Sequence, residues 1–361
     1  MRILVVNAGS SSIKLRLLDG RDELLAATDL PVERGEVDDG KLSSALSAMP
    51  SADAVGHRVV HGGERFVSPV TIDEEVKAAL SDLVDLAPLH QPKSLLAMEA
   101  VGAALPELPA VACFDTAFHA GLPPAAATYA LPRSWRERFG LRRFGFHGLS
   151  HAYASRRAEA LVGRNGLRIV TCHLGAGASL AAVRDGCSID TTMGFTPLEG
   201  LVMSTRSGSI DPGMLLWLLE REAISEREMA AALEHGSGLA GLAGTGDVRE
   251  VVARAERGVT EARLALDVYV HRLQAGIAAM AAALRGLDAL VFTGGVGENS
   301  STIRELACEG LGFLGVELEG DRNAGASGDT EIGSARADVA VLVVTAREDI
   351  EIAHGVRWVL G

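Results

Sequence analysis

The sequence predicts an α/β protein with mixed sheets, built as two domains. A length of 361 residues is more than one ordinary hydrophobic core accommodates. Strand-like and helix-like segments alternate along the chain. A strand, a glycine/serine turn and a returning strand occur at the start and again near mid-chain. This recurrence suggests a duplicated fold with one hairpin in each half.

The first hairpin begins with an apolar strand at 3–6, followed by a turn at 7–12. In the returning strand Ile13, Leu15 and Leu17 alternate with polar residues, which is typical of a half-buried strand. A short strand at 111–114 ends at Asp115, and the pattern predicts a helix over 150–161.

The second hairpin has a strand at 168–174, a turn at 175–179 and a return at 180–183. The helix after it is expected to start with Pro212 in its first turn. The remaining elements are a helix at 260–284, a strand at 288–292, a surface turn region at 320–333, a strand at 339–344 and a closing helix at 348–359.

Composition limits the partners. Hydrophobic residues make up 48% of the chain and charged residues 22%, as expected for a folded globular protein. The net charge of −13 disfavours a nucleic-acid or anionic-membrane partner, because either selects for a basic patch. No segment approaches the ~18 consecutive apolar residues of a membrane helix, and the start becomes polar too soon for a signal peptide. We therefore expect a cytoplasmic protein that binds neither nucleic acid nor membrane.

Three turns of small residues supply backbone N–H groups that can converge on an anion. Besides the turns at 7–12 and 175–179, a glycine-rich loop at 293–299 follows a strand and precedes a helical stretch at 302–311. Each alone is equally compatible with an ordinary turn, but three in this order favour a phosphate-bearing ligand. The P-loop, protein-kinase and dinucleotide fingerprints are absent, so a nucleotide would need another cradle.

Five charged or polar positions are considered as candidates for chemistry. Arg58 lies in an apolar, glycine-rich run and Arg206 among small residues, so both are poorly explained as solvated surface arginines. Two guanidinium groups can clamp a carboxylate and a phosphoryl group. Asp115 ends a buried strand, where either a functional role or a helix N-cap is expected. His147 and His151 are more typical of a structural pair than of a metal site.

These motifs closely resemble the acetokinase family. The matching segments keep their order and span almost the whole chain, at 7–14, 56–63, 87–90, 114–119, 145–148, 193–201 and 292–299. The resemblance implies two duplicated ribonuclease H-like domains with mixed sheets around a nucleotide cleft, the fold of the acetate and sugar kinase/Hsp70/actin superfamily. It implies an N-terminal domain of residues 1–147 plus 348–361 and a nucleotide-binding domain of residues 148–347.

The resemblance also implies reversible in-line phosphoryl transfer from ATP to acetate, giving acetyl phosphate and ADP. It implies Mg²⁺, with Mn²⁺ as an alternative, and a homodimer. Propionate or butyrate remains open as the acceptor, because one methylene is worth only ~1–3 kcal/mol in an apolar pocket. A nucleotide switch like actin or Hsp70 is less favoured, since it would not need Arg58, Arg206 and His147.

Site residues follow from the resemblance position by position. Catalysis is assigned to Arg58, Asp115, His147 and Arg206, and no general base is needed because a carboxylate is already deprotonated. Arg58 also binds the acid, whose methyl group is assigned to Val60, Leu89 and Pro197. The metal is assigned to Asn7 and Glu348, although the dipole of the last helix alone would also explain Glu348. The nucleotide is assigned to Ser10, Ser12, Lys14, His173, Gly175, Ala176, Gly177, Asp247, Val248, Arg249, Gly295, Val296, Gly297, Glu298 and Asn299. Ala176 stands where the family usually has Asn.

Overall fold

The computed structural model describes residues 1–9, 12–31, 39–87 and 91–361. The chain divides into two compact units. The first unit consists of Met1–Ala120, Phe146–Tyr153 and Arg347–Gly361, and the second of Gly121–Gly145 and Ala154–Ala346. The division into an N-terminal domain of residues 1–147 plus 348–361 and a nucleotide-binding domain of residues 148–347 remains a prediction.

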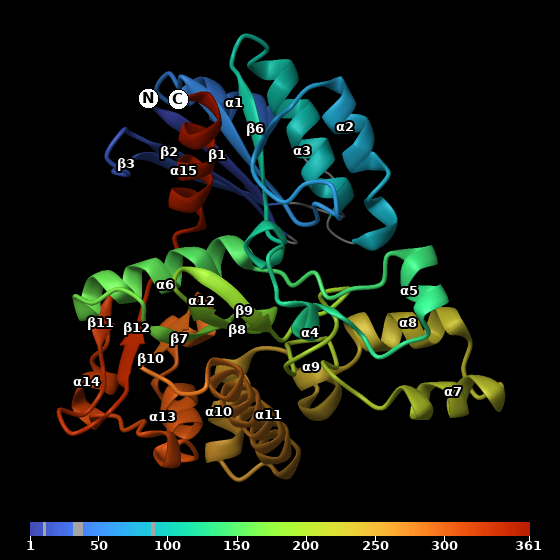
Figure 1. The fold of residues 1–361 in the computed structure, drawn as a ribbon, viewed down its shortest axis with the longest axis vertical. Helices are drawn as coiled ribbons and strands as arrows, with labels where there is room; N and C mark the ends of the chain where they lie inside the picture. The colour runs from blue at the N-terminus through green and yellow to red at the C-terminus, as the bar shows by residue number, and fades with distance from the viewer. Residues whose placement is uncertain (10–11, 32–38, 88–90) are drawn as a thin grey trace. The chain divides into compact units, whose positions relative to one another are not determined.

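The first unit contains a six-stranded sheet in the order β3-β2-β1-β4-β6-β5 (Figure 1). Three strands form an antiparallel meander: β1 (Ile3–Ala8), β2 (Ser12–Leu18) and β3 (Leu24–Pro31). On the other side of β1, the strands β4 (Ala54–Val59) and β6 (Ala110–Phe114) run parallel to it. The short β5 (Val70–Thr71) closes the edge antiparallel to β6.

The second unit repeats this topology in a sheet of order β11-β12-β10-β7-β8-β9. Its strands are β7 (Arg168–Leu174), β8 (Ala178–Arg184), β9 (Cys187–Thr191), β10 (Ala289–Thr293), β11 (Thr330–Glu331) and β12 (Ala340–Val343). The meander β7-β8-β9 is antiparallel, β10 and β12 are parallel to β7, and β11 is antiparallel at the edge. The predicted α/β class with mixed sheets is confirmed. The equivalent strands follow the same order in the two sheets.

Helices cover both faces of the first sheet. The helix α15 (Glu348–Leu360) packs Ile352, Ala353 and Val356 onto one face. On the other face α1 (Asp39–Ala48) and α3 (Gln91–Ala104) contribute to a second core with Leu4, Val6 and Leu15, and α2 (Glu74–Ser81) lies beside α3. Fully buried apolar side chains on both faces explain why this sheet forms.

In the second unit the long helix α11 (Thr260–Leu284) packs on β7, β8 and β9. The helix α6 (Gly148–Val162) begins in the first unit and ends in the second. The shorter helices are α4 (Pro124–Ala127), α5 (Arg133–Phe139), α7 (Pro212–Glu220), α8 (Glu226–His235), α9 (Gly238–Ala243), α10 (Val248–Glu256), α12 (Gly294–Asn299), α13 (Ser301–Glu309) and α14 (Gly320–Ala324). Among the described residues, no helix combines the length and apolarity needed to cross a membrane.

The predictions for two segments, expected to be irregular, are wrong. The glycine-rich segment predicted as a loop forms α12, because two side chains bind the ends of this short helix: Glu298 from within it and Arg304 from α13. Its first N–H donates to Glu298, and its last carbonyls accept from Arg304. The region predicted as a surface turn contains α14 and β11, and α14 is capped at its start by the carboxylate of Glu319.

Candidate functional site

A buried ion pair joins the ends of two parallel strands in the first unit. Arg58 lies in β4, and Asp115 directly follows the neighbouring strand β6. The Arg58 Nη2 is 2.5 Å from Oδ2 of Asp115, and Nε donates to both carboxylate oxygens at 3.1 and 3.2 Å. The side chains are only 14% and 1% exposed, which excludes a solvated Arg58. Asp115 is not a helix N-cap, because Thr116 precedes the next helical turn.

Asn7 and Glu348 complete a cluster around Arg58. Asn7 lies in β1, and Glu348 is the first residue of α15. Arg58 Nη1 donates to Oδ1 of Asn7 at 3.2 Å, and Asn7 Nδ2 donates to Oε2 of Glu348 at 2.7 Å. The same Glu348 oxygen lies 3.8 Å from Arg58 Nε. Glu348 is therefore part of a polar cluster in addition to its place at a helix start.

The cluster places two carboxylates beside one guanidinium. Burial raises the pKa of Asp115, while the charge of Arg58 opposes that rise. Burial also disfavours the charge on Arg58, but attraction by Asp115 and Glu348 prevails and raises the pKa of Arg58, so the guanidinium stays protonated. Mg²⁺ typically uses one or two carboxylates together with water and substrate phosphates. The oxygens of Asn7, Asp115 and Glu348 fit such an ion, and the described residues hold no larger His/Cys/Asp/Glu group.

His147 is fixed by its backbone beside Asp115. Its φ of 55° lies in the left-handed region, which is uncommon for a residue with a side chain. The backbone N–H of His147 donates to the Asp115 carboxylate, and the N–H of Gly148 donates to the Asp115 carbonyl at 2.9 Å. A Cβ on Gly148 would lie 2.1 Å from that carbonyl oxygen. His151 is fully buried, and its ring centroid is 5.7 Å from that of His119.

The second unit contains a pocket of about 680 Å³. It brings together eight of the residues that the resemblance assigns to the nucleotide: Gly175, Ala176, Asp247, Val248, Arg249, Gly295, Val296 and Asn299. These come from the β7–β8 turn, the start of α10 and the helix α12. The volume and the small residues suit a flat heteroaromatic ligand with a few polar contacts.

Polar side chains organise the rim of this pocket. Asp247 accepts from the N–H of Arg249 at 2.9 Å as the N-cap of α10, and the two side chains form an ion pair at 2.7 Å. The hydrogen bonds from Arg249 lower the pKa of Asp247. Ser204 donates to the carbonyl of Gly246 at 2.9 Å and so fixes the segment leading into α10.

Arg206 is also in the second unit, where Nη1 donates to the carbonyl of Pro197 at 2.7 Å. Burial lowers the pKa of Arg206, against the attraction of Glu234. The segment that carries Pro197 is anchored by Glu199, which accepts from Tyr129 Oη at 2.5 Å and from Arg143 Nη2 at 2.8 Å.

The other predicted site residues are placed as follows. Lys14 is exposed on β2 and lies opposite Asn7 in the β1–β2 register, and Ser12 starts β2. His173 is in β7, Gly177 accepts from the N–H of Gly175, and Gly297 is buried in α12. Val60 is buried in the first unit. Ser10 and Leu89 lie outside the described residues.

Part of the pocket wall consists of residues that were not predicted from the sequence. Val252, Ala253 and Glu256 line the pocket on the same face of α10 as Arg249. Their spacing of three, four and seven residues from Arg249 is the signal that identifies one helix face. The other missed lining residues are Ser204, Gly246, Ser300, Ser301 and Thr302.

Comparisons with known proteins agree with this architecture. The family model described as "Acetokinase family" matches residues 36–354. A protein of Deinococcus deserti named acetate kinase is 47% identical, covering 100% of this chain and 98% of its own. The crystal structure of Porphyromonas gingivalis acetate kinase is 36% identical with a TM-score of 0.90, covering both chains fully. A propionate kinase from Francisella tularensis is 34% identical with a TM-score of 0.91, covering 99% of this chain and 100% of its own. The predicted superfamily fold is thereby confirmed, and the chain belongs to the acetokinase family.

Proposed function

We propose that this protein is an acetate kinase that transfers the terminal phosphoryl group of ATP reversibly to acetate. The observation that carries the proposal is the protonated, buried Arg58 held among Asp115, Asn7 and Glu348. A cation in this position binds a carboxylate substrate and offsets charge on a transferring phosphoryl group. The pocket in the second unit supports the nucleotide half of the reaction, and membership of the acetokinase family supports a carboxyl acceptor.

The chemistry requires little covalent work from the protein. Arg58 and Arg206 bind the acid carboxylate and the phosphoryl oxygens, and the side chain of His147 donates to the same group. Acetate is already deprotonated, so it attacks the terminal phosphorus in line and no residue removes a proton. Asp115 orients Arg58 through its paired hydrogen bonds. Asn7 and Glu348 would hold Mg²⁺ or Mn²⁺, which neutralises charge on the phosphate oxygens when bound.

The nucleotide is placed by backbone and small side chains. The adenosine part lies in the pocket against α10 and α12, near Asp247, Val248 and Arg249. The phosphates are assigned to Gly175 and Gly177 of the β7–β8 turn and to Ser12 and Lys14 of β2, and Ser10 is assigned to them by the resemblance alone.

Acetate is favoured over longer acids because relatives named acetate kinase are similar over nearly the whole chain. A propionate kinase is a comparably close structural neighbour. Val60, Leu89 and Pro197 are proposed to hold the methyl group, and a further methylene changes binding by only about 1–3 kcal/mol. The test incubates the protein with Mg-ATP and acetate, propionate or butyrate, and traps acyl phosphate as hydroxamate. Acetate should give the highest kcat/KM. ATP binding without any acyl phosphate would favour a nucleotide switch.

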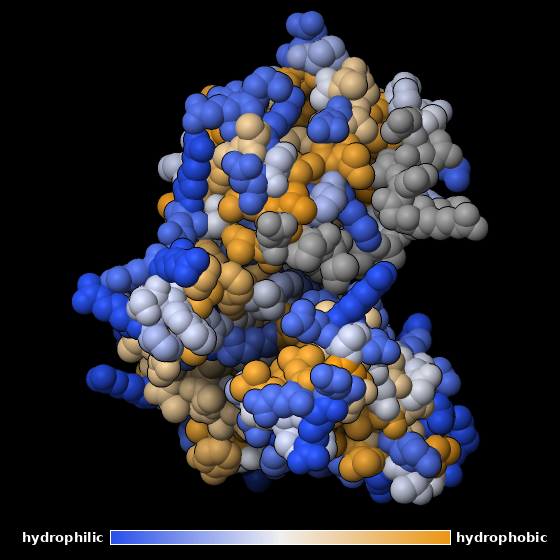
Figure 2. Space-filling model, turned by 90° about the vertical axis from the view of Figure 1, so that its right-hand side faces the viewer, coloured by the Kyte–Doolittle hydropathy of each residue, from blue (hydrophilic) through white to orange (hydrophobic). Residues whose placement is uncertain are grey.

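We further propose that the protein is a homodimer through α7. This helix has the sequence Pro-Gly-Met-Leu-Leu-Trp-Leu-Leu-Glu, yet none of its residues is buried. Met214, Leu216 and Trp217 are 47%, 59% and 52% exposed. Figure 2 views the side that carries α5 and α7, where apolar residues are exposed among polar ones. Such an apolar surface is typical of an interface.

Light scattering tests the dimer. The wild type should have twice the mass of one chain, and Leu216→Glu should have the mass of one chain. The melting temperature of Leu216→Glu should not be lower than that of a matched monomeric sample. The control is Leu264→Glu, at a residue that is 55% exposed on α11. A monomeric wild type would contradict the proposal.

A further inference from the structure

The carboxylate of Glu298 is turned away from the nucleotide pocket toward backbone. Its Oε1 accepts from the N–H of Gly294, the first residue of its own helix α12, at 3.0 Å. The same oxygen accepts from the N–H of Ala346, also at 3.0 Å. Glu298 is absent from the lining of the pocket, whereas its helix neighbours Val296 and Asn299 belong to it. The geometry therefore disagrees with a role as a nucleotide ligand.

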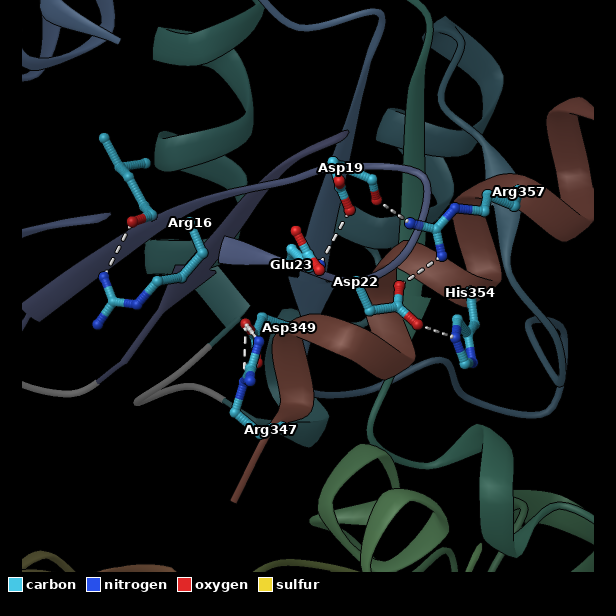
Figure 3. A network of polar contacts seen from close by, with 9 residues as sticks. Arg16, Asp19, Asp22, Glu23, Arg347, Asp349, His354 and Arg357 are labelled. Carbon is cyan, nitrogen blue, oxygen red and sulfur yellow. Dashed lines mark hydrogen bonds and ion pairs between the residues drawn. The ribbon is translucent and has the colours of Figure 1, made fainter. Parts of the chain in front are cut away.

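Ala346 is the last residue of the second unit, and the chain passes there into the first unit. Only Arg347 separates it from Glu348, which contacts Asn7 and Arg58. This short connection is stabilised by hydrogen bonds: Arg347 Nε and Nη2 each donate at 2.9 Å to the carboxylate of Asp349 (Figure 3). A displacement of Ala346 is therefore expected to reach Glu348 with little loss.

The second half of α15 is also fixed within the first unit. His354 Nε2 lies 2.8 Å from Oδ2 of Asp22, and Arg357 Nη1 donates to Oδ1 of Asp22 at 2.7 Å (Figure 3). Asp22 belongs to the turn between β2 and β3. Because α15 is held to its sheet by these contacts, we expect a shift in the position of Glu348 to come from the segment before Arg347.

The other end of α12 is held by Arg304. This arginine is only 2% exposed, and its Nη1 donates to the carbonyls of Gly297 and Glu298 at 2.9 and 2.8 Å. Its Nε and Nη2 donate to the side chain and carbonyl of Asn323, each at 2.8 Å. A buried charge with this many partners is costly to displace, so this end of α12 is held firmly to its surroundings.

We propose that Glu298 is a positioning residue that couples the nucleotide pocket to the Arg58–Asp115–Asn7–Glu348 cluster. A nucleotide contacting α12 restricts that helix, the two hydrogen bonds of Glu298 pass the restriction to Ala346, and Glu348 is thereby held in its place. This inference rests on the proposed function, because it assigns the pocket to a nucleotide. It differs from the resemblance, which implies that Glu298 binds the nucleotide itself.

Amide hydrogen exchange at Ala346 tests the coupling without any turnover. In the wild type, saturating ADP should slow exchange at this amide by about tenfold, in the range usual for coupled sites. In Glu298→Ala, ADP should no longer slow exchange at Ala346, and because coupling is reciprocal, metal-free calorimetry should give an ADP affinity that is lower by no more than about tenfold. In Glu298→Gln the amide oxygen accepts the same two hydrogen bonds, so affinity and slowing should both be kept.

Asp329→Ala is the matched control. Asp329 Oδ1 accepts from the N–H of Thr345 at 2.9 Å and Oδ2 from Arg157 Nε at 2.6 Å, so it anchors the same crossover to α6 and not to α12. Its removal should speed exchange at Thr345 and keep the effect of ADP on Ala346.

As a kinetic readout, the Mg²⁺ concentration for half-maximal rate should rise in Glu298→Ala and stay unchanged in Glu298→Gln.

Three results would overturn the inference. ADP has no effect on Ala346 in the wild type, the effect persists in Glu298→Ala, or ADP affinity falls in both Glu298 variants. If Glu298→Ala does not fold, Glu298→Gln decides, since lost ADP affinity there identifies the carboxylate as a ligand. Failure of the proposed function is separate, because it shows as a wild type that makes no acyl phosphate.

Discussion

Removal of Arg58 is expected to cost stability as well as activity. Arg58→Ala leaves the Asp115 carboxylate, which is 1% exposed, without its charged partner, and it removes three contacts at 2.5, 3.1 and 3.2 Å. Breaking a buried pair by removing one partner costs about 3–5 kcal/mol. Turnover should fall by about 10³-fold or more, as for other arginines that stabilise a transferring phosphoryl group.

A double-mutant cycle separates the two effects. Urea unfolding is measured for the wild type, Arg58→Ala, Asp115→Ala and the double variant, with acyl phosphate formation on the same samples. The double variant should be close to Asp115→Ala in stability, because no unpaired buried carboxylate remains, while activity stays lost. The control is Arg65→Ala: Arg65 pairs with Glu75 at 2.5 Å, but the side chains are 55% and 77% exposed. Its loss should cost at most about 1 kcal/mol.

Strict additivity of the two single variants would refute this account of the cluster. It would mean that Asp115 finds equal solvation without Arg58, in conflict with its burial. Normal turnover in Arg58→Ala would refute the assignment of Arg58 to the phosphoryl group.

Three further predictions follow from single positions. Gly148→Ala puts a Cβ 2.1 Å from the Asp115 carbonyl oxygen, so kcat should fall by about 10²-fold while the KM for ADP is unchanged, and equal kcat would contradict the packing. Burial lowers the pKa of His57 from 6.5 to about 4, so the neutral ring contributes stability above pH 6.5 that is lost as the pH falls toward 4, by up to about 3 kcal/mol. Melting temperatures should fall more steeply across this window in the wild type than in His57→Gln, and parallel curves would show that His57 is protonated in the folded state. Ala176→Asn adds an amide donor at the exposed pocket wall and should tighten ADP binding by about 1 kcal/mol in calorimetry, with unchanged affinity as the contrary result.

Much of the fold was predictable because local patterns were strong. The strand at 168–174 and the helix at 260–284 have the predicted bounds, since long apolar runs and buried helix faces specify them. The helix α12 was not predictable, because three glycines oppose helix formation locally. It forms through Glu298 and through Arg304, whose burial no local pattern indicates.

The candidate site divides in the same way. Gly175 of the second turn and the Asp247–Arg249 segment were identified from motifs, and the structure gathers them with α12 in one pocket. The pairing of Arg58 with Asp115, 57 positions apart, depends on β4 and β6 being neighbours in the sheet, which spacing alone does not specify. The turn of Glu298 toward Ala346 depends likewise on tertiary structure.

The most direct test of the central claim is ³¹P NMR of the wild type with Mg-ATP and acetate. Acetyl phosphate and ADP should appear together, adding acetyl phosphate and ADP should regenerate ATP, and neither reaction should occur in Arg58→Ala. ADP with inorganic phosphate but no acetyl phosphate, in fresh wild-type protein, would contradict this claim, because the phosphoryl group would then pass to water and not to the carboxylate.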